Sequence, residues 1–340
     1  YQMFYSCSSL TSLNLSSFSG SSITNMDHMF SECTSLEYID LSNFITVFPI
    51  SLSYAFKRCT SLISIDLSSL NSIKTFESAF EECTSLISIK LGNLNYANNM
   101  NMMFWNCKSL QYFNLSNFDL SSVTTMYFMF YGCSSLIKVD LSNLNIAKVA
   151  SMQSMFVSCS SLIEVNLSNI TAYSVYNMEN MFSGCDSLIS LDFSSFITIN
   201  ISNLKQLFYK CNSLISLNLL NFDTSHVTNM EKMFYECNSL LSLDLSSFNT
   251  SKVKNMNEMF SGCNSLISLD LSNFVFSSVL NVENMFYDCN SLEYIDISKF
   301  ENVPTGTEKM FYGVKDNLVY CIRDENKASN IINQLKKDIC

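Results

Sequence analysis

Twelve cysteines recur at a fixed spacing along this chain of 340 residues. Successive cysteines are 26 residues apart, except for two successive spacings of 24, and each is followed two and three residues later by Ser-Leu, as in Cys263-Asn264-Ser265-Leu266. A fixed period of this length is the signature of a repeat architecture, in which each unit stacks on its neighbours to bury a continuous core. The spacing therefore predicts a solenoid of about twelve rungs, one rung for each repeat.

The first half of each repeat has the pattern of a β-strand. Leucines and a phenylalanine follow the order LxxLxLxxF, as in Leu266, Leu269, Leu271 and Phe274. Apolar and polar residues alternate from Leu269 to Ser272, and an alternation with period 2 places successive side chains on opposite faces of a strand. We expect one short parallel strand per rung, with Leu facing inward and Asp and Ser facing outward.

The second half of each repeat changes period. Met256, Met259, Phe260 and Cys263 fall at positions i, i+3, i+4 and i+7, which is one apolar stripe of a two-turn helix. The fold class predicted from the sequence is therefore an α/β repeat, a solenoid with one short parallel strand and one short helix per rung.

The repeats end before the chain does. Residues 1–313 are predicted to form the solenoid, and its N-terminal unit is expected to be truncated because Tyr1 to Cys7 match the end of a repeat. After residue 313 the pattern gives way to an apolar stretch at Asn317 to Ile322 and then to a predicted helix ending near Lys337. Since solenoids need a polar terminal element, residues 314–340 are predicted to form a C-terminal strand-helix cap.

Composition and charge exclude several classes of function. The net charge of -11 argues against a nucleic-acid partner, which would be held by neutralising phosphates. The run of apolar residues needed for a transmembrane helix is absent from the sequence, so no membrane span is expected. No pattern resembles a catalytic triad, a zinc box or a paired-carboxylate site, so we predict that the chain is not an enzyme and uses no cofactor.

The repeat resembles a known family. Its LxxLxL strand is similar to that of leucine-rich repeats, and Phe222-Asp223-Thr224-Ser225-His226-Val227-Thr228-Asn229-Met230, followed by Met233-Phe234 and Cys237-Asn238-Ser239-Leu240, resembles the 26-residue surface-protein repeat of the BspA-like group. The resemblance covers residues 1 to about 313. It implies an extracellular or cell-surface location and a role in adhesion or in host or matrix binding. A repeat specifies a scaffold, however, and function resides in the exposed positions.

One outward column of the predicted strands stands out as a ligand face. It lies between the second and third strand leucines and is rich in carboxylates and amides: Asp40, Asp66, Asp140, Asp192, Asp244, Asp270, Asp296, Asn114, Asn166 and Asn218. Carboxylates on neighbouring rungs repel one another, so this column favours a hydrogen-bonding sugar or a cation, calcium being the candidate. The alternative is a solvated acidic face whose Asp side chains bond nearby backbone and Ser groups.

The cysteines fall into two groups. The twelve periodic cysteines lie at the end of the apolar stripe, where Cys acts as a small hydrophobe, and we expect free core thiols there, the alternatives being a metal ladder or a disulfide framework. Cys321 and Cys340 lie outside the repeat and would close a loop of 20 residues. A disulfide between them is predicted to stabilise the cap by about 3 kcal/mol in an oxidising compartment.

The sequence also contains acceptor motifs for N-glycosylation, at Asn14, Asn114, Asn166, Asn169, Asn200 and Asn249. If the protein is secreted by a eukaryote, the loop positions Asn169, Asn200 and Asn249 are the expected glycan carriers, because glycans on strand positions would crowd the ligand face.

Two functions follow from these patterns. The first is a non-enzymatic extracellular or cell-surface adhesion protein that binds protein or glycan through its repetitive strand face. The second is a structural subunit of an extracellular fibre or surface coat, in which copies of the chain assemble end to end or laterally through an uncapped rung.

Overall fold

The computed structural model describes residues 2–15, 17–18, 20–70, 72–116, 118–197, 199–300, 306–324, 329, 331–333 and 335. The chain divides into two compact units, Tyr1–Ser174 (unit 1) and Val175–Cys340 (unit 2), and each is a parallel β-coil. The parallel strands predicted from the repeat are confirmed in most rungs of each unit, whereas residues 241–245 form no strand.

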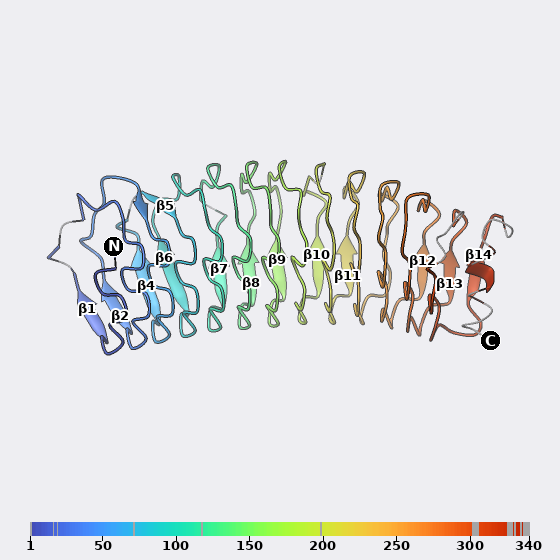
Figure 1. Cartoon of the computed structure of the whole chain (residues 1–340), viewed down its shortest axis with the longest axis horizontal. Coiled ribbons are helices and arrows are strands. Elements are labelled where there is room, and N and C mark those ends of the chain that lie inside the picture. The colour runs from blue at the N-terminus through green and yellow to red at the C-terminus, as the bar shows by residue number, and fades with distance from the viewer. Residues whose placement is uncertain are drawn as a thin grey trace. The chain divides into compact units, whose positions relative to one another are not determined.

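The strands are two to four residues long and lie side by side within each unit (Figure 1). Unit 1 contains β1 (Ser12–Asn14), β2 (Tyr38–Asp40), β3 (Ile50–Ser51), β4 (Ser64–Leu67), β5 (Ile73–Thr75), β6 (Ser88–Leu91), β7 (Tyr112–Asn114), β8 (Lys138–Asp140) and β9 (Glu164–Asn166). Unit 2 contains β10 (Ser190–Asp192), β11 (Ser216–Asn218), β12 (Ser268–Asp270), β13 (Tyr294–Asp296) and β14 (Val319–Cys321).

Strand pairing keeps the register of the repeat. Leu191 on β10 pairs with Leu217 on β11, one full repeat later. Asp66 on β4 pairs with Lys90 on β6, only 24 residues later. The two residues missing from each short repeat are lost after the strand, before the chain reaches the opposite side of the coil, so the strand pairing is unaffected. The strand column therefore stays in register from β4 to β6, across the first short repeat.

The helix predicted for each rung is wrong. In the segment that ends at Cys263, the N–H of Met259 donates to the carbonyl of Met256 at 3.2 Å, and the N–H of Cys263 donates to the carbonyl of Phe260 at 3.1 Å. These bonds span three residues, whereas an α-helix bonds residues four apart. The segment is a series of tight turns that places its apolar residues inward with the same spacing as a helical stripe.

The physical reason lies in the neighbouring rung. The N–H groups of Glu258 and Gly262 donate to the carbonyls of Glu283 and Tyr287, one rung further along, at 2.9 and 2.7 Å. A helix would use these N–H groups internally, and the next rung would then leave its carbonyls unpaired. Glu258 and Gly262 both have positive φ, 53° and 74°, which closes the turns and prevents a continuous helix.

A second parallel ladder runs along the opposite wall of the coil, where each turn segment begins. In unit 2 it consists of single-residue bridges between asparagines in successive rungs: Asn177, Asn203, Asn229, Asn255 and Asn281. These side chains accept hydrogen bonds from the backbone two residues further along; Asn229 Oδ1, for example, accepts the N–H of Glu231 at 2.9 Å. In unit 1, β3 and β5 belong to this wall.

The core fills the space between the two walls. Strand leucines such as Leu266 and turn methionines such as Met256 are fully buried. Phenylalanines at one turn position stack from rung to rung; Phe234 and Phe260 lie 5.5 Å apart with rings 7° from parallel. Full burial of such side chains contributes about 1.5 to 3 kcal/mol each before the entropy cost is subtracted, so stacking supplies most of the stabilisation.

Near the C-terminus the described chain contains a strand and a helical segment. β14 pairs with β13 in parallel, with Val319 opposite Tyr294. Within the described ranges, helix occurs only at Ser329, residues 331–333 and Leu335, of which Ile331 and Leu335 are buried. The predicted division into a solenoid over 1–313 and a cap over 314–340 stays a prediction.

Candidate functional site

The outward-facing side chains of the repeat strands form the candidate site, which we call the strand face. The unit 1 strand face runs from Ser12 and Asn14 on β1 to Glu164 and Asn166 on β9, and the unit 2 strand face runs from Ser190 and Asp192 on β10 to Tyr294 and Asp296 on β13. The strands alternate as predicted: on β10, Ser190 and Asp192 are exposed and Leu191 is buried.

The structure places the predicted ligand column on this face in both units. Each member closes a local turn, in which its Oδ1 accepts the backbone N–H two residues further along, as Asp270 does from Ser272 at 2.8 Å. The members that make this turn are Asp40, Asp66, Asp140, Asp192, Asp244, Asp270, Asp296, Asn114, Asn166 and Asn218. The local bonding weighed as the alternative to a ligand role is therefore present in every one.

These hydrogen bonds favour the charged form of the carboxylates. The pKa of Asp40 is lowered by the backbone N–H of Ser42, and the pKa of Asp244 is lowered by the hydroxyl and backbone N–H of Ser246. The pKa of Asp66 is lowered in the same way by Ser68, with a smaller effect from Lys90. Asp40, Asp66 and Asp244 are consequently anionic at neutral pH.

Three shallow hollows open on the strand face. The largest, of about 480 Å³, lies in unit 1 over β2, β4 and β6, where Tyr38, Asp40, Asp66 and Lys90 line it. A second unit 1 hollow of about 310 Å³ lies over β7 and β8 and is lined by Tyr112, Phe113, Asn114, Lys138 and Asp140. In unit 2 a hollow of about 380 Å³ is lined by Ser242, Leu243, Asp244, Leu245, Ser246, Ser268, Asp270, Ser272 and Asn273.

A row of exposed aliphatic side chains, which the sequence pattern did not predict, lies in the same rungs as the ligand column. It occupies the position directly after the Ser-Leu pair that follows each cysteine, and in unit 2 it consists of Ile189, Ile215, Leu241 and Ile267. These side chains retain between 45% and 50% of their exposed area. The signal in the sequence was a second apolar residue immediately after a buried leucine, which breaks the alternation that a half-buried strand should show.

The carboxylates of the strand face do not gather in groups. Among the described residues, no cluster of three or more His, Cys, Asp and Glu side chains is arranged to hold a metal ion. The column places at most one acidic group in each rung, so the calcium alternative for the Asp ladder has a row of single carboxylates rather than a coordination cage.

The two histidines lie apart from the hollows. His28 stacks on Tyr54 with ring centroids 4.7 Å apart. His226 lies in an exposed loop, where its Nδ1 is 3.1 Å from the Oγ of Ser225. Neither residue lines any of the three hollows, so the exposed hollows carry no histidine for acid-base chemistry.

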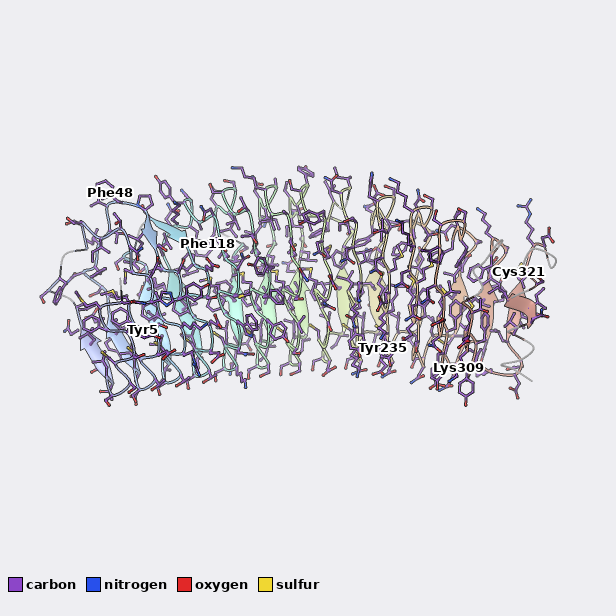
Figure 2. All side chains as sticks on the ribbon, in the orientation of Figure 1. Tyr5, Phe48, Phe118, Tyr235, Lys309 and Cys321 are labelled. Carbon is purple, nitrogen blue, oxygen red and sulfur yellow. The ribbon has the colours of Figure 1, made fainter. Side chains whose placement is uncertain are left out.

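The predicted modification sites remain predictions. Cys321 is exposed on β14 (Figure 2), and its proposed disulfide partner Cys340 lies outside the described residues. Among the glycosylation candidates, Asn14 and Asn114 are exposed on strands, Asn166 is half-buried on β9, and Asn169, Asn200 and Asn249 are exposed in loops. Asn169 Nδ2 donates to Asn143 Oδ1 at 3.1 Å, so a glycan at Asn169 would require this bond to be given up.

Within the described part of the chain, no helix is long and apolar enough to cross a bilayer.

Comparison with solved structures finds leucine-rich repeat proteins at low identity. A T. pallidum leucine rich repeat protein is 24% identical over 60% of this chain and 75% of that chain, with a TM-score of 0.32. A leucine rich cell surface protein from Faecalibacterium prausnitzii is 17% identical over 83% of this chain and 80% of that chain (TM-score 0.30), and an internalin from Listeria monocytogenes is 16% identical over 97% and 86% (TM-score 0.29). No curated protein matches the chain.

Family models match most of the sequence. The model of the BspA type leucine rich repeat region (6 copies) matches residues 1–125, which confirms the resemblance to BspA-like repeats. A second model matches residues 74–196 and 202–319, more than half of the chain. The chain therefore belongs to the family described as Mycoplasma protein of unknown function, DUF285.

Proposed function

We propose that this protein is a non-enzymatic recognition protein of the cell surface or extracellular space, which binds a macromolecular partner, protein or glycan, through its strand face. The observation that carries the proposal is that the three hollows described above all open on the strand face and are lined by its side chains. A repeated, rigid surface with small hollows suits contact with a large partner better than enclosure of a small substrate.

The scaffold supports this role physically. The strands are held in place by buried leucines on the inner side, such as Leu191 and Leu269, whereas the outward side chains do not pack in the core. Side chains on such regular elements are positioned more precisely than those on loops, which lowers the entropy cost of binding. The outer residues can therefore set specificity without changing the fold.

The proposal is tested by two variants in the same rung. Ser242→Arg places a large side chain on the unit 2 strand face, and Ser251→Arg places the same side chain, with the same charge, on an exposed loop. Both proteins are screened with the wild type against immobilised extracellular matrix proteins and a glycan array. We expect partners of the wild type to be lost from the Ser242→Arg variant and retained by the Ser251→Arg variant.

A matched pair in unit 1, Ser64→Arg on β4 and Ser22→Arg on an exposed turn, extends the same test to the first unit. Partners that bind all four variants as well as the wild type would show that the strand faces are not the binding surface, and the proposal would be abandoned.

A further inference from the structure

We propose that the unit 2 strand face is the docking site for a short, extended, cationic segment of a partner protein. This inference rests on the proposed function and specifies its partner. It follows from two parallel rows of exposed side chains, one anionic and one aliphatic, that the structure places along the same rungs.

The anionic row consists of Asp192, Asp244, Asp270 and Asp296, with Asn218 between the first two. Asp270 and Asp296 are direct partners in the strand ladder, and neighbouring strands lie about 4.8 Å apart. No salt bridge reaches any of these four carboxylates from the part of the chain that the structure describes. The row is a line of like charges that repel one another and attract a cation from outside.

The fold does not require this charge. The turn after each strand needs only an oxygen acceptor, and in three rungs an amide provides it: Asn218 accepts the N–H of Leu220 at 3.2 Å, and Asn114 and Asn166 make the equivalent bonds. An amide at Asp244, Asp270 and Asp296 would close the same turns without the repulsion. Three consecutive carboxylates therefore cost stability that the turn geometry does not recover.

The aliphatic row lies three residues before the anionic row in each rung, and one residue before a row of exposed serines. Its members in unit 2 are Ile189, Ile215, Leu241 and Ile267. The backbone N–H of Ile215 bonds to the carbonyl of Ile189 at 2.8 Å, so these residues occupy adjacent rungs. The row ends at Glu293, which forms an ion pair with Lys315 at 2.6 Å. Aliphatic groups half exposed in a continuous row are the surface that an incoming apolar side chain would cover.

The two rows together specify an extended segment. From Asp192 to Asp296 there are four rung spacings, or about 19 Å, which an extended chain covers with about six residues. Such a chain, lying over the serines, directs alternate side chains to opposite sides. Lysine or arginine would then face the carboxylates, and aliphatic residues would face Ile215, Leu241 and Ile267. The unit 2 hollow, lined by Ser242 and Ser268, lies under the centre of this path.

The unit 1 strand face differs in the same column and serves as an internal control. Lys90 replaces the carboxylate there and pairs with Asp66 at 3.1 Å, and in the neighbouring column, where unit 2 carries mostly serine, Lys138 pairs with Glu164 at 2.7 Å. Two of the carboxylates of unit 1 are therefore neutralised within the chain, so a cationic segment gains less from this face.

The experiment measures binding of a fluorescein-labelled hexapeptide, acetyl-Lys-Val-Lys-Val-Lys-Val-amide, to the full chain by fluorescence anisotropy. The test variant is D244N/D270N/D296N, and the control variant is D40N/D66N/D140N in unit 1. Both raise the net charge by the same amount and keep the acceptor that each turn needs. We expect the test variant to bind the peptide at least about tenfold more weakly than the wild type and the control variant to stay within about twofold.

Two further measurements test each row separately. Raising the salt from about 50 to about 500 mM shortens the Debye length from about 14 to about 4 Å, and we expect it to weaken binding by wild type several-fold more than binding by the test variant. The variant I215S/L241S/I267S is expected to weaken binding about fivefold, whereas a peptide with Ser in place of Val should bind that variant and the wild type equally.

The outcomes separate this inference from the proposed function. Equal loss in the two triple Asn variants would mean that the overall negative charge attracts the peptide. Equal binding of a peptide with Glu in place of Lys would mean that charge plays no part. Either outcome overturns the inference.

If the peptide does not bind, or if partners lost from Ser242→Arg are neutral glycans that bind D244N/D270N/D296N normally, the cationic partner is wrong while the proposed function stands. If Ser242→Arg and Ser64→Arg lose no partner, the proposed function fails as well.

Discussion

The thiol of Cys263 donates a hydrogen bond to the backbone carbonyl of Phe234 in the preceding rung, with Sγ 3.2 Å from the oxygen. The same carbonyl also accepts the N–H of Cys237, in its own rung, at 3.1 Å. Buried cysteines throughout the repeat make this contact, from Cys59 to Phe30 at 3.1 Å up to Cys289 to Phe260 at 3.1 Å. Each cysteine therefore links its own rung to the one before it, in addition to filling a small space in the core.

Removing this link should destabilise the fold at a single rung. We predict that Cys263→Ala lowers the free energy of unfolding by about 1 to 2 kcal/mol, because it removes a hydrogen bond, leaves a carbonyl with one bond fewer and opens a small cavity. With both proteins kept reduced, so that no disulfide forms at Cys321, Cys321→Ala, at an exposed position on β14, is expected to change it by less than about 0.5 kcal/mol. Urea unfolding of both variants provides the measurement, and equal stabilities would show that the contact contributes nothing.

The buried thiols should resist chemical modification in the folded protein. Eleven cysteines from Cys33 to Cys289 are free and buried, whereas Cys7 and Cys321 are exposed. Burial raises the pKa of the Cys33 thiol to about 11 and raises those of Cys107 and Cys263 well above their ordinary value, so the reactive thiolate is scarce. In protein reduced beforehand, we expect iodoacetamide at pH 8 to label Cys7 and Cys321 rapidly and these eleven only after denaturation, as peptide mass spectrometry would show. Rapid native labelling of Cys159 would contradict the burial described here.

Stability should fall at alkaline pH. A thiol whose pKa is raised in the folded state binds its proton more tightly there than in the unfolded chain, where the pKa is about 8.5. The stabilisation is therefore complete below about pH 8.5 and is lost as the pH rises through the folded values, by about 1.4 kcal/mol per pH unit for each fully buried thiol. Burial also raises the pKa of Tyr235, to about 12, which adds to the loss. Melting temperatures measured from pH 7 to pH 11 should decline steadily above pH 8.5; a flat profile would exclude the mechanism.

The second turn of each rung offers a test of backbone strain. Gly262 has φ 74°, and a Cβ there would meet Glu236 Cγ at 3.0 Å, whereas Ser158 occupies the equivalent position four rungs earlier with φ 58°. We predict that Ser158→Gly raises the free energy of unfolding by about 0.5 to 1 kcal/mol and that Gly262→Ser lowers it by about 1 kcal/mol or more. Thermal melts of the reciprocal pair should show shifts of opposite sign. Shifts of the same sign would mean that the two turns are not equivalent.

The phenylalanine column should be the most sensitive part of the core. Phe234 stacks between Phe208 and Phe260, with centroid distances of 5.7 and 5.5 Å, and is fully buried. Phe234→Ala is expected to cost about 3 to 5 kcal/mol, and Phe234→Leu about 1.5 kcal/mol, because leucine keeps most of the volume. Chemical denaturation measures both. A cost for Phe234→Ala close to that of Phe234→Leu would indicate that the rungs collapse around the cavity.

The sequence pattern predicted most of the strands and the buried cysteines correctly, because each depends on which residues face inward. Leu269 is buried and Asp270 is exposed, as the alternation requires. The helical interpretation failed because residues four apart can also face the same way in a chain of tight turns. Met256, Phe260 and Cys263 are buried in both geometries, so burial alone could not distinguish them. The decisive information was the bond from Gly262 to Tyr287, in another rung.

The candidate site was predicted in part. The position of the Asp and Asn column followed from the strand period, and so did its alternative role in bonding nearby backbone. The aliphatic row containing Ile215 and Ile267 was missed because an apolar residue beside Leu214 or Leu266 is expected in a core. The charge difference between the two strand faces depends on ion pairs such as Lys138 with Glu164, which join residues in different repeats.

The two ladders that bound each rung have a consequence for how such a protein can change its length. In the short repeats Asp66 still pairs with Lys90, and Thr75 still bridges to Asn99, so both walls remain aligned although two residues are missing between them. Changes in the connecting loop are tolerated, whereas loss of a single residue within either wall would turn every later side chain to the wrong side. Such a gene can therefore grow or shrink by whole repeats, and shorter insertions or deletions are confined to the loops.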